Sequence, residues 1–141
     1  MLDEAERRFL ERQRVGHLAT ADAEARPHVV PVCYALAGAN LYIAIDGKPK
    51  SGGKLKRLQN IEQNPNVSLV VDRYDDDWTR LGWVLLHGHA ELLHDGGERD
   101  AALVLLQDRY PPYRDMAFDG RPVIALRIAR VACWGNLEEN P

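Results

Sequence analysis

The 141-residue chain has few cysteines and no long apolar run. Cys33 and Cys133 are too few for a disulfide scaffold, so we expect a reducing, cytoplasmic setting. No apolar stretch approaches the roughly 18 residues that a membrane span needs. The charged start of the chain lacks the apolar core of a signal peptide. The sequence therefore predicts no membrane partner and no signal peptide.

An excess of positive charge is also missing. Eighteen basic and 21 acidic residues give a net charge of -3, which argues against a general nucleic-acid binder. Hydrophobic residues make up 45% and charged residues 28%, the ordinary mix of a globular protein. The length suits one domain, and no linker divides the chain. We therefore expect residues 1–141 to form a single domain.

Apolar residues recur at helical spacing over three segments, which predicts helices over residues 3–13, 54–63 and 98–107. Runs of strand-forming residues predict six strands, over residues 15–21, 27–36, 41–46, 67–74, 83–93 and 122–134. Pro31, inside the second run, indicates an edge strand or a bulge. Short turns favour an antiparallel sheet, and its unprotected edges favour closure into a small barrel.

Lysine is scarce and confined to one segment. Fourteen of the 18 basic residues are arginines, and the four lysines and one arginine of this segment are Lys48, Lys50, Lys54, Lys56 and Arg57. The segment lacks the spacing of a phosphate-binding P-loop. Its glycines, its hydroxyl and the start of the next helix nevertheless suit an anion such as phosphate or carboxylate. The alternative is a solvated basic loop.

Two histidines fall on one face of a predicted strand. Strand alternation places His87 and His89 beside Trp83, Leu85 and Glu91. Without a third ligand at suitable spacing, we expect these histidines to line a pocket or a barrel wall, and we expect no metal site.

Other candidate groups are sparse. The only serines, Ser51 and Ser68, have no evident base partner, and Cys33 and Cys133 are expected to be buried, inert thiols. Trp78 lies in a polar loop, where packing explains it least, so it is available to stack on a flat ligand. The sequence identifies no catalytic residue.

Three stretches carry a resemblance to a known family. They are residues 19–32, with the string Arg26–Val32; residues 46–72, from the lysine segment through the following helix and strand; and Asp72–Trp78 followed by Trp83. Together they resemble the pyridoxamine 5'-phosphate oxidase-like split β-barrel proteins. The third stretch is similar to the actinobacterial branch of F420-dependent oxidoreductases.

The resemblance implies a mainly β fold with helices: a homodimer of six-stranded antiparallel split β-barrels, with cofactor sites at the dimer interface. Members bind FMN or the 5-deazaflavin coenzyme F420, and a few bind haem. Arg57 falls where the family contacts the cofactor phosphate, and the nearby lysines lie where a strand end and loop approach it. The positions that the resemblance places along the cofactor ring are His28, Val30, Pro31, Val32 and Ile45.

The resulting hypothesis is an F420-dependent oxidoreductase that transfers hydride to a small, electron-poor organic substrate. The cofactor carries the chemistry, and the protein binds and orients the reactants and excludes water. Tyr34, Tyr74, His28 or solvent would supply a proton. The alternatives are an FMN-dependent oxidoreductase, a deazaflavin- or haem-binding protein without turnover, and a cofactor-free dimeric barrel.

Overall fold

The computed structural model describes residues 1–46 and 55–138. Its helices are α1 (Glu4–Arg12), α2 (Lys56–Gln63) and α3 (Gly97–Arg109), with short 3-10 helices η1 (Trp78–Arg80) and η2 (Pro111–Asp115). Its strands are β1 (Gly16–Ala21), β2 (Pro27–Val32), β3 (Ala35–Ala37), β4 (Asn40–Ile43), β5 (Asn66–Arg73), β6 (Gly82–Leu93) and β7 (Val123–Gly135). The mainly β, antiparallel architecture expected from the sequence is confirmed.

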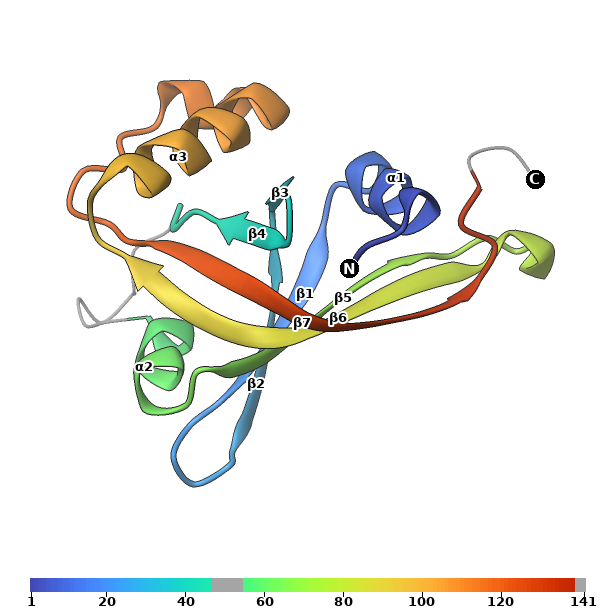
Figure 1. The fold of residues 1–141 in the computed structure, drawn as a ribbon, viewed down its shortest axis with the longest axis horizontal. Coiled ribbons are helices and arrows are strands. Elements are labelled where there is room, and N and C mark those ends of the chain that lie inside the picture. Colours follow the sequence, from blue (N-terminus) through green and yellow to red (C-terminus); the bar gives the residue numbers. More distant parts are fainter. Residues whose placement is uncertain (47–54, 139–141) are drawn as a thin grey trace.

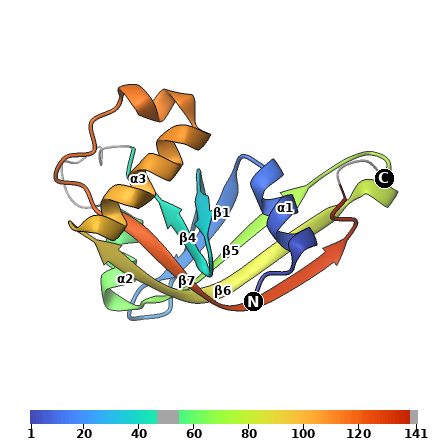
Figure 2. The same ribbon diagram turned by 45° about the horizontal axis from the view of Figure 1, so that its top comes forward.

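The seven strands form one curled antiparallel sheet in the order β2-β1-β5-β6-β7-β4-β3, shaped as a half-barrel (Figure 1). Side chains from β1, β4, β5, β6 and β7 fill its concave interior together with residues of α1 and α2. α2 packs against β1 and β6, whereas α3 covers β3, β4 and β7 over a second apolar cluster (Figure 2). None of the helices in the described ranges is long and apolar enough to cross a membrane.

The predicted strand over residues 27–36 is divided, which raises the strand number from six to seven. β2 pairs with β1 at one edge of the sheet, and β3 pairs with β4 at the other. Between them Tyr34 is buried, and its hydroxyl donates to the Leu10 carbonyl at 2.5 Å. The chain therefore crosses the barrel at Tyr34, and a single strand cannot serve both edges. Pro31 lies on an edge strand, as expected.

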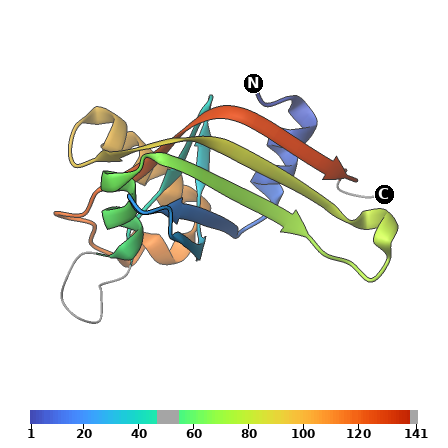
Figure 3. The same ribbon diagram turned by 90° about the horizontal axis from the view of Figure 1, so that it is seen from below.

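Three strands extend beyond the barrel as an arm. β5, β6 and the end of β7 run together to the η1 turn (Figure 3), and residues 136–138 lie beside them. The guanidinium of Arg73 donates to the carbonyls of Arg80, Asn136 and Glu138 at 2.7 to 2.8 Å. This one side chain therefore ties the C-terminal segment to the arm.

Asp22 joins the turn between β1 and β2 to the start of α2. Its buried carboxylate accepts hydrogen bonds from the backbone of Glu24 and Arg26 and from the Arg26 guanidinium, and Lys56 Nζ lies 3.7 Å away. The Arg26 backbone bond first, and its side-chain bond second, lower the pKa of Asp22 from 3.8 to about 2.

We expect Asp22→Asn to lower the midpoint of thermal unfolding at pH 7. A depressed folded-state pKa contributes stability above the unfolded pKa, and that contribution is lost as pH falls through the folded value. The difference between variant and wild type should therefore close between about pH 4 and pH 2, as followed by circular dichroism. Asp119→Asn serves as the control, because it removes the same charge from an exposed side chain. A difference that persisted at pH 2 would contradict this role.

Candidate functional site

A small hollow lies where the ends of β2 and β4 meet the start of α2. Its volume is about 130 Å³, and its walls include Pro31, Val32, Cys33, Asp46, Arg57 and Tyr113. We call it the Arg57 hollow. Three of the predicted cofactor residues, on two separate elements, therefore meet in one place: Pro31 and Val32 on β2, and Arg57 on α2.

Arg57 presents an unpaired donor in this hollow. Its Nε is buried and has no hydrogen-bond partner among the described residues. Burial lowers the pKa of Arg57, whereas the nearby Asp46 and Tyr113 raise it. A buried guanidinium donor without an acceptor is costly. An anion placed against Arg57 would satisfy it through a charge-assisted bond.

Tyr113 and Asp46 form a second polar pair in the hollow. The Tyr113 hydroxyl donates to Asp46 Oδ2 at 2.7 Å. Burial, followed by this acceptor, raises the pKa of Tyr113, so the phenol remains protonated and donates. Sequence analysis did not single out either residue. They are 67 positions apart, and η2 brings them together, so no local pattern signals the contact.

The remaining predicted positions are more dispersed. Ile45 is buried in the barrel core, and Val30 packs against that core from β2. His28 is half-buried on β2, with Nδ1 unpaired among the described residues. Trp78 is 71% exposed at the tip of the arm, which extends away from α2 (Figure 3). Three predicted phosphate-binding positions lie outside the described residues: Lys48, Lys50 and Lys54.

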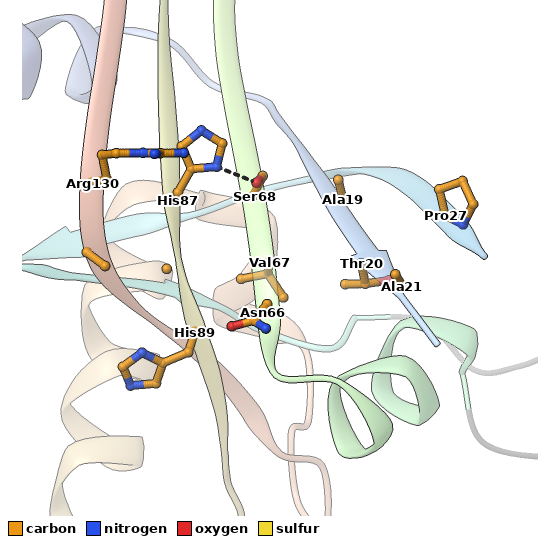
Figure 4. A pocket seen from close by; sticks show the side chains of 12 residues that line it. Ala19, Thr20, Ala21, Pro27, Asn66, Val67, Ser68, His87, His89 and Arg130 are labelled. Carbon is orange, nitrogen blue, oxygen red and sulfur yellow. Dashed lines mark hydrogen bonds between the residues drawn. The ribbon is translucent and has the colours of Figure 1, made fainter. Parts of the chain in front are cut away.

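A larger hollow of about 590 Å³ lies on the outer face of β1, β5, β6 and β7 (Figure 4). Ser68 Oγ and His87 Nδ1 are 2.8 Å apart there, and Arg130 pairs with His87 across the strands. His87 and His89 share this face, as strand alternation predicts, and both line the hollow. No group of three or more potential metal ligands occurs among the residues that the structure describes.

Several expectations are corrected by burial. Cys33 is only half-buried in the Arg57 hollow, and Cys133 is exposed because it lies where β7 runs into the arm. The hydroxyl of Tyr34 is committed to a core carbonyl, and burial raises the pKa of Tyr34, which argues against a role as proton donor. Tyr74 is 68% exposed on the arm, where it donates to Asp76.

Comparison with known proteins agrees with this fold. The chain is 29% identical over 130 residues to a 5a,11a-dehydrotetracycline/5a,11a-dehydrooxytetracycline reductase of Streptomyces rimosus, covering 90% of this chain and 78% of the reductase. A solved structure of an FAD-binding protein from Mesorhizobium loti is 28% identical, with a TM-score of 0.71 and 94% coverage of both chains.

Other solved structures share the fold at lower identity. A conserved hypothetical protein from Mycobacterium tuberculosis has a TM-score of 0.76 at 22% identity, covering 96% of this chain and 86% of that one. A haem-binding protein from Mycobacterium smegmatis and a haem storage protein from Vibrio cholerae also have this fold. The family model described as pyridoxamine 5'-phosphate oxidase matches residues 2–135. The chain therefore belongs to the pyridoxamine 5'-phosphate oxidase family.

Proposed function

We propose that this protein is an F420-dependent oxidoreductase that reduces a small, electron-poor organic substrate. The observation that carries the proposal is the buried Nε of Arg57, which lies in the Arg57 hollow and has no hydrogen-bond partner among the described residues. The similarity to a reductase supports oxidoreductase chemistry, and the similarity to an FAD-binding protein supports a flavin-type cofactor. The residues present fit the phosphate of such a cofactor, because the guanidinium of Arg57 supplies a donor that an anionic phosphate oxygen would satisfy.

The proposed roles combine the Arg57 hollow with the family resemblance. Arg57 would bind the cofactor phosphate together with Lys48, Lys50, Lys54 and Lys56. His28 and the backbone of Val30–Val32 would flank the ring system, with Ile45 shaping the wall behind it. When bound, the reduced deazaflavin supplies the hydride, and the protein orients the substrate and excludes water.

We also propose that the protein acts as a homodimer with its cofactor sites between subunits. The arm holds Trp78 far from the Arg57 hollow of its own subunit, so a ring-stacking role for Trp78 requires the partner's site. The outer face from which a dimer would be built exposes Trp134 and carries a shallow depression lined by Val70, Trp83 and Leu85 together with His17 and Asp72. Exposed aromatic and aliphatic side chains gathered on one sheet face are typical of an interface.

A haem-binding role is the second candidate, and the two histidines of the outer hollow favour it. Imidazole nitrogen is the commonest protein ligand for haem iron. Nδ1 of His87 is engaged with Ser68, which leaves the opposite ring nitrogen as the available ligand atom.

Parallel titrations distinguish these functions. Binding is followed as the change in each cofactor's fluorescence. We expect the protein to bind F420 more tightly than FMN, because the lysine segment also suits the polyanionic tail of F420. Tighter binding of FMN would replace the deazaflavin proposal with the FMN alternative. A haem Soret band that shifts in His87→Ala, without binding of either flavin-type cofactor, would instead favour the haem-binding role.

A further inference from the structure

An acidic side chain stands beside the proposed phosphate-binding arginine. Asp46 and Arg57 line the same hollow, and their charges interact. A carboxylate that paired with Arg57 would satisfy the guanidinium and compete with any phosphate for it. Yet Nε of Arg57 has no partner, and no ion pair joins Arg57 to an acid within the described part of the chain.

Tyr113 explains why the Asp46 carboxylate does not pair with Arg57. Its hydroxyl binds Oδ2 of Asp46 at 2.7 Å. Asp46 is exposed and therefore free to adopt other rotamers unless it is held. The Tyr113 ring, in contrast, is buried between Tyr110 and Phe118, with ring centroids 5.6 and 5.4 Å away. A hydroxyl fixed in this way is a preorganised donor for a mobile carboxylate.

We propose that Tyr113 is a positioning residue that holds the Asp46 carboxylate away from Arg57, which keeps Arg57 available for the cofactor phosphate. This inference rests on the proposed function, because it assigns a phosphate to Arg57. It explains why an acid is tolerated at the rim of an anion site. Tyr113 and Asp46 thereby set how strongly the site binds anions.

The test compares Tyr113→Phe, Asp46→Asn and the double variant. We expect Tyr113→Phe to weaken F420 binding about fivefold to tenfold, because the released carboxylate turns to Arg57. Asp46→Asn in that background should restore the affinity to that of Asp46→Asn alone, since an amide cannot form the ion pair. Rescue by a second substitution is a readout that a merely structural loss would not give.

Tyr42→Phe is the matched control. The Tyr42 hydroxyl donates to Glu98 Oε2 at 2.6 Å, so it is also a buried phenol bound to a carboxylate, but outside the Arg57 hollow. It should leave F420 affinity unchanged. Unchanged affinity in Tyr113→Phe, or a loss that Asp46→Asn does not rescue, would overturn the inference.

A second probe separates this inference from the proposed function. Inorganic pyrophosphate is titrated against all variants, and binding is followed as the rise in the midpoint of thermal unfolding. If wild type binds no flavin-type cofactor, the proposed function fails. The inference then stands only if pyrophosphate binding is weakened in Tyr113→Phe and recovered in the double variant, and it falls if pyrophosphate binds equally to all or to none.

Discussion

We expect Arg57→Met to bind F420 about tenfold to a hundredfold more weakly than wild type, because hydrogen bonds to charged groups contribute roughly 1.5 to 3 kcal/mol. Methionine retains an unbranched, apolar stem of similar length while removing the guanidinium. Because Nε of half-buried Arg57 has no hydrogen-bond partner in the described ranges, removing the guanidinium should not greatly reduce stability. Equilibrium fluorescence titration measures the affinity, and thermal unfolding checks the fold.

Two controls make this result specific to the phosphate. Riboflavin and FMN differ only by the phosphate, so Arg57→Met should reduce the preference of the protein for FMN over riboflavin. Arg8→Met removes a guanidinium that is 50% exposed on α1, where it pairs with Glu4. It should leave every cofactor affinity unchanged. A variant at Arg57 that bound FMN and F420 as tightly as wild type would remove Arg57 from the site.

We expect Gly88→Ala to destabilise the protein strongly, because an added methyl group would meet the backbone of the neighbouring strand. A Cβ at Gly88 would lie 2.0 Å from the backbone oxygen of Arg127 and 3.0 Å from Leu126 Cδ2. The oxygen belongs to the neighbouring strand at the point where the register of β6 and β7 shifts. It cannot move without opening that pairing. We expect a loss of about 3 kcal/mol, the upper end of typical overpacking costs.

Gly97→Ala is the matched control for that substitution. Gly97 is the first residue of α3, and a Cβ there meets nothing within 4 Å. Since alanine is the better helix former, this variant should be neutral or up to about 1 kcal/mol more stable. Urea unfolding of both variants measures the contrast. Equal stabilities would show that β6 and β7 adjust to the extra methyl group.

Local pattern in the sequence was enough to find most elements. The helix expected over residues 3–13 is α1, and its Asp3–Glu6 capping box is present. The long strands β5, β6 and β7 lie within two residues of their predicted bounds. His87 and His89 share one face because the extra residue at the register shift belongs to β7, so the alternation of β6 is intact. Helical and strand periodicity depends on neighbouring residues and can be read locally.

The order of the strands in the sheet, and the division of the predicted strand over residues 27–36, could be found only from the tertiary structure. Whether a strand-forming run pairs with one edge or two depends on where distant strands lie. Tyr34 marks the crossing, and its partners are Leu10 and Tyr110, which no local pattern relates to it. The same reason explains the exposed Cys133, because exposure depends on how far the arm extends beyond the barrel.

The candidate site divides in the same way. The sequence by itself determined that positive charge is concentrated beside a helix start and that Arg57, Pro31 and Val32 are candidate cofactor residues, since residue type and resemblance are local properties. Only the tertiary structure placed those three residues around one hollow and added Asp46 and Tyr113 to it. Their hydrogen bond joins a strand end to a turn 67 residues later, and it exists because the packing of Tyr113 against Phe118 fixes where the hydroxyl points.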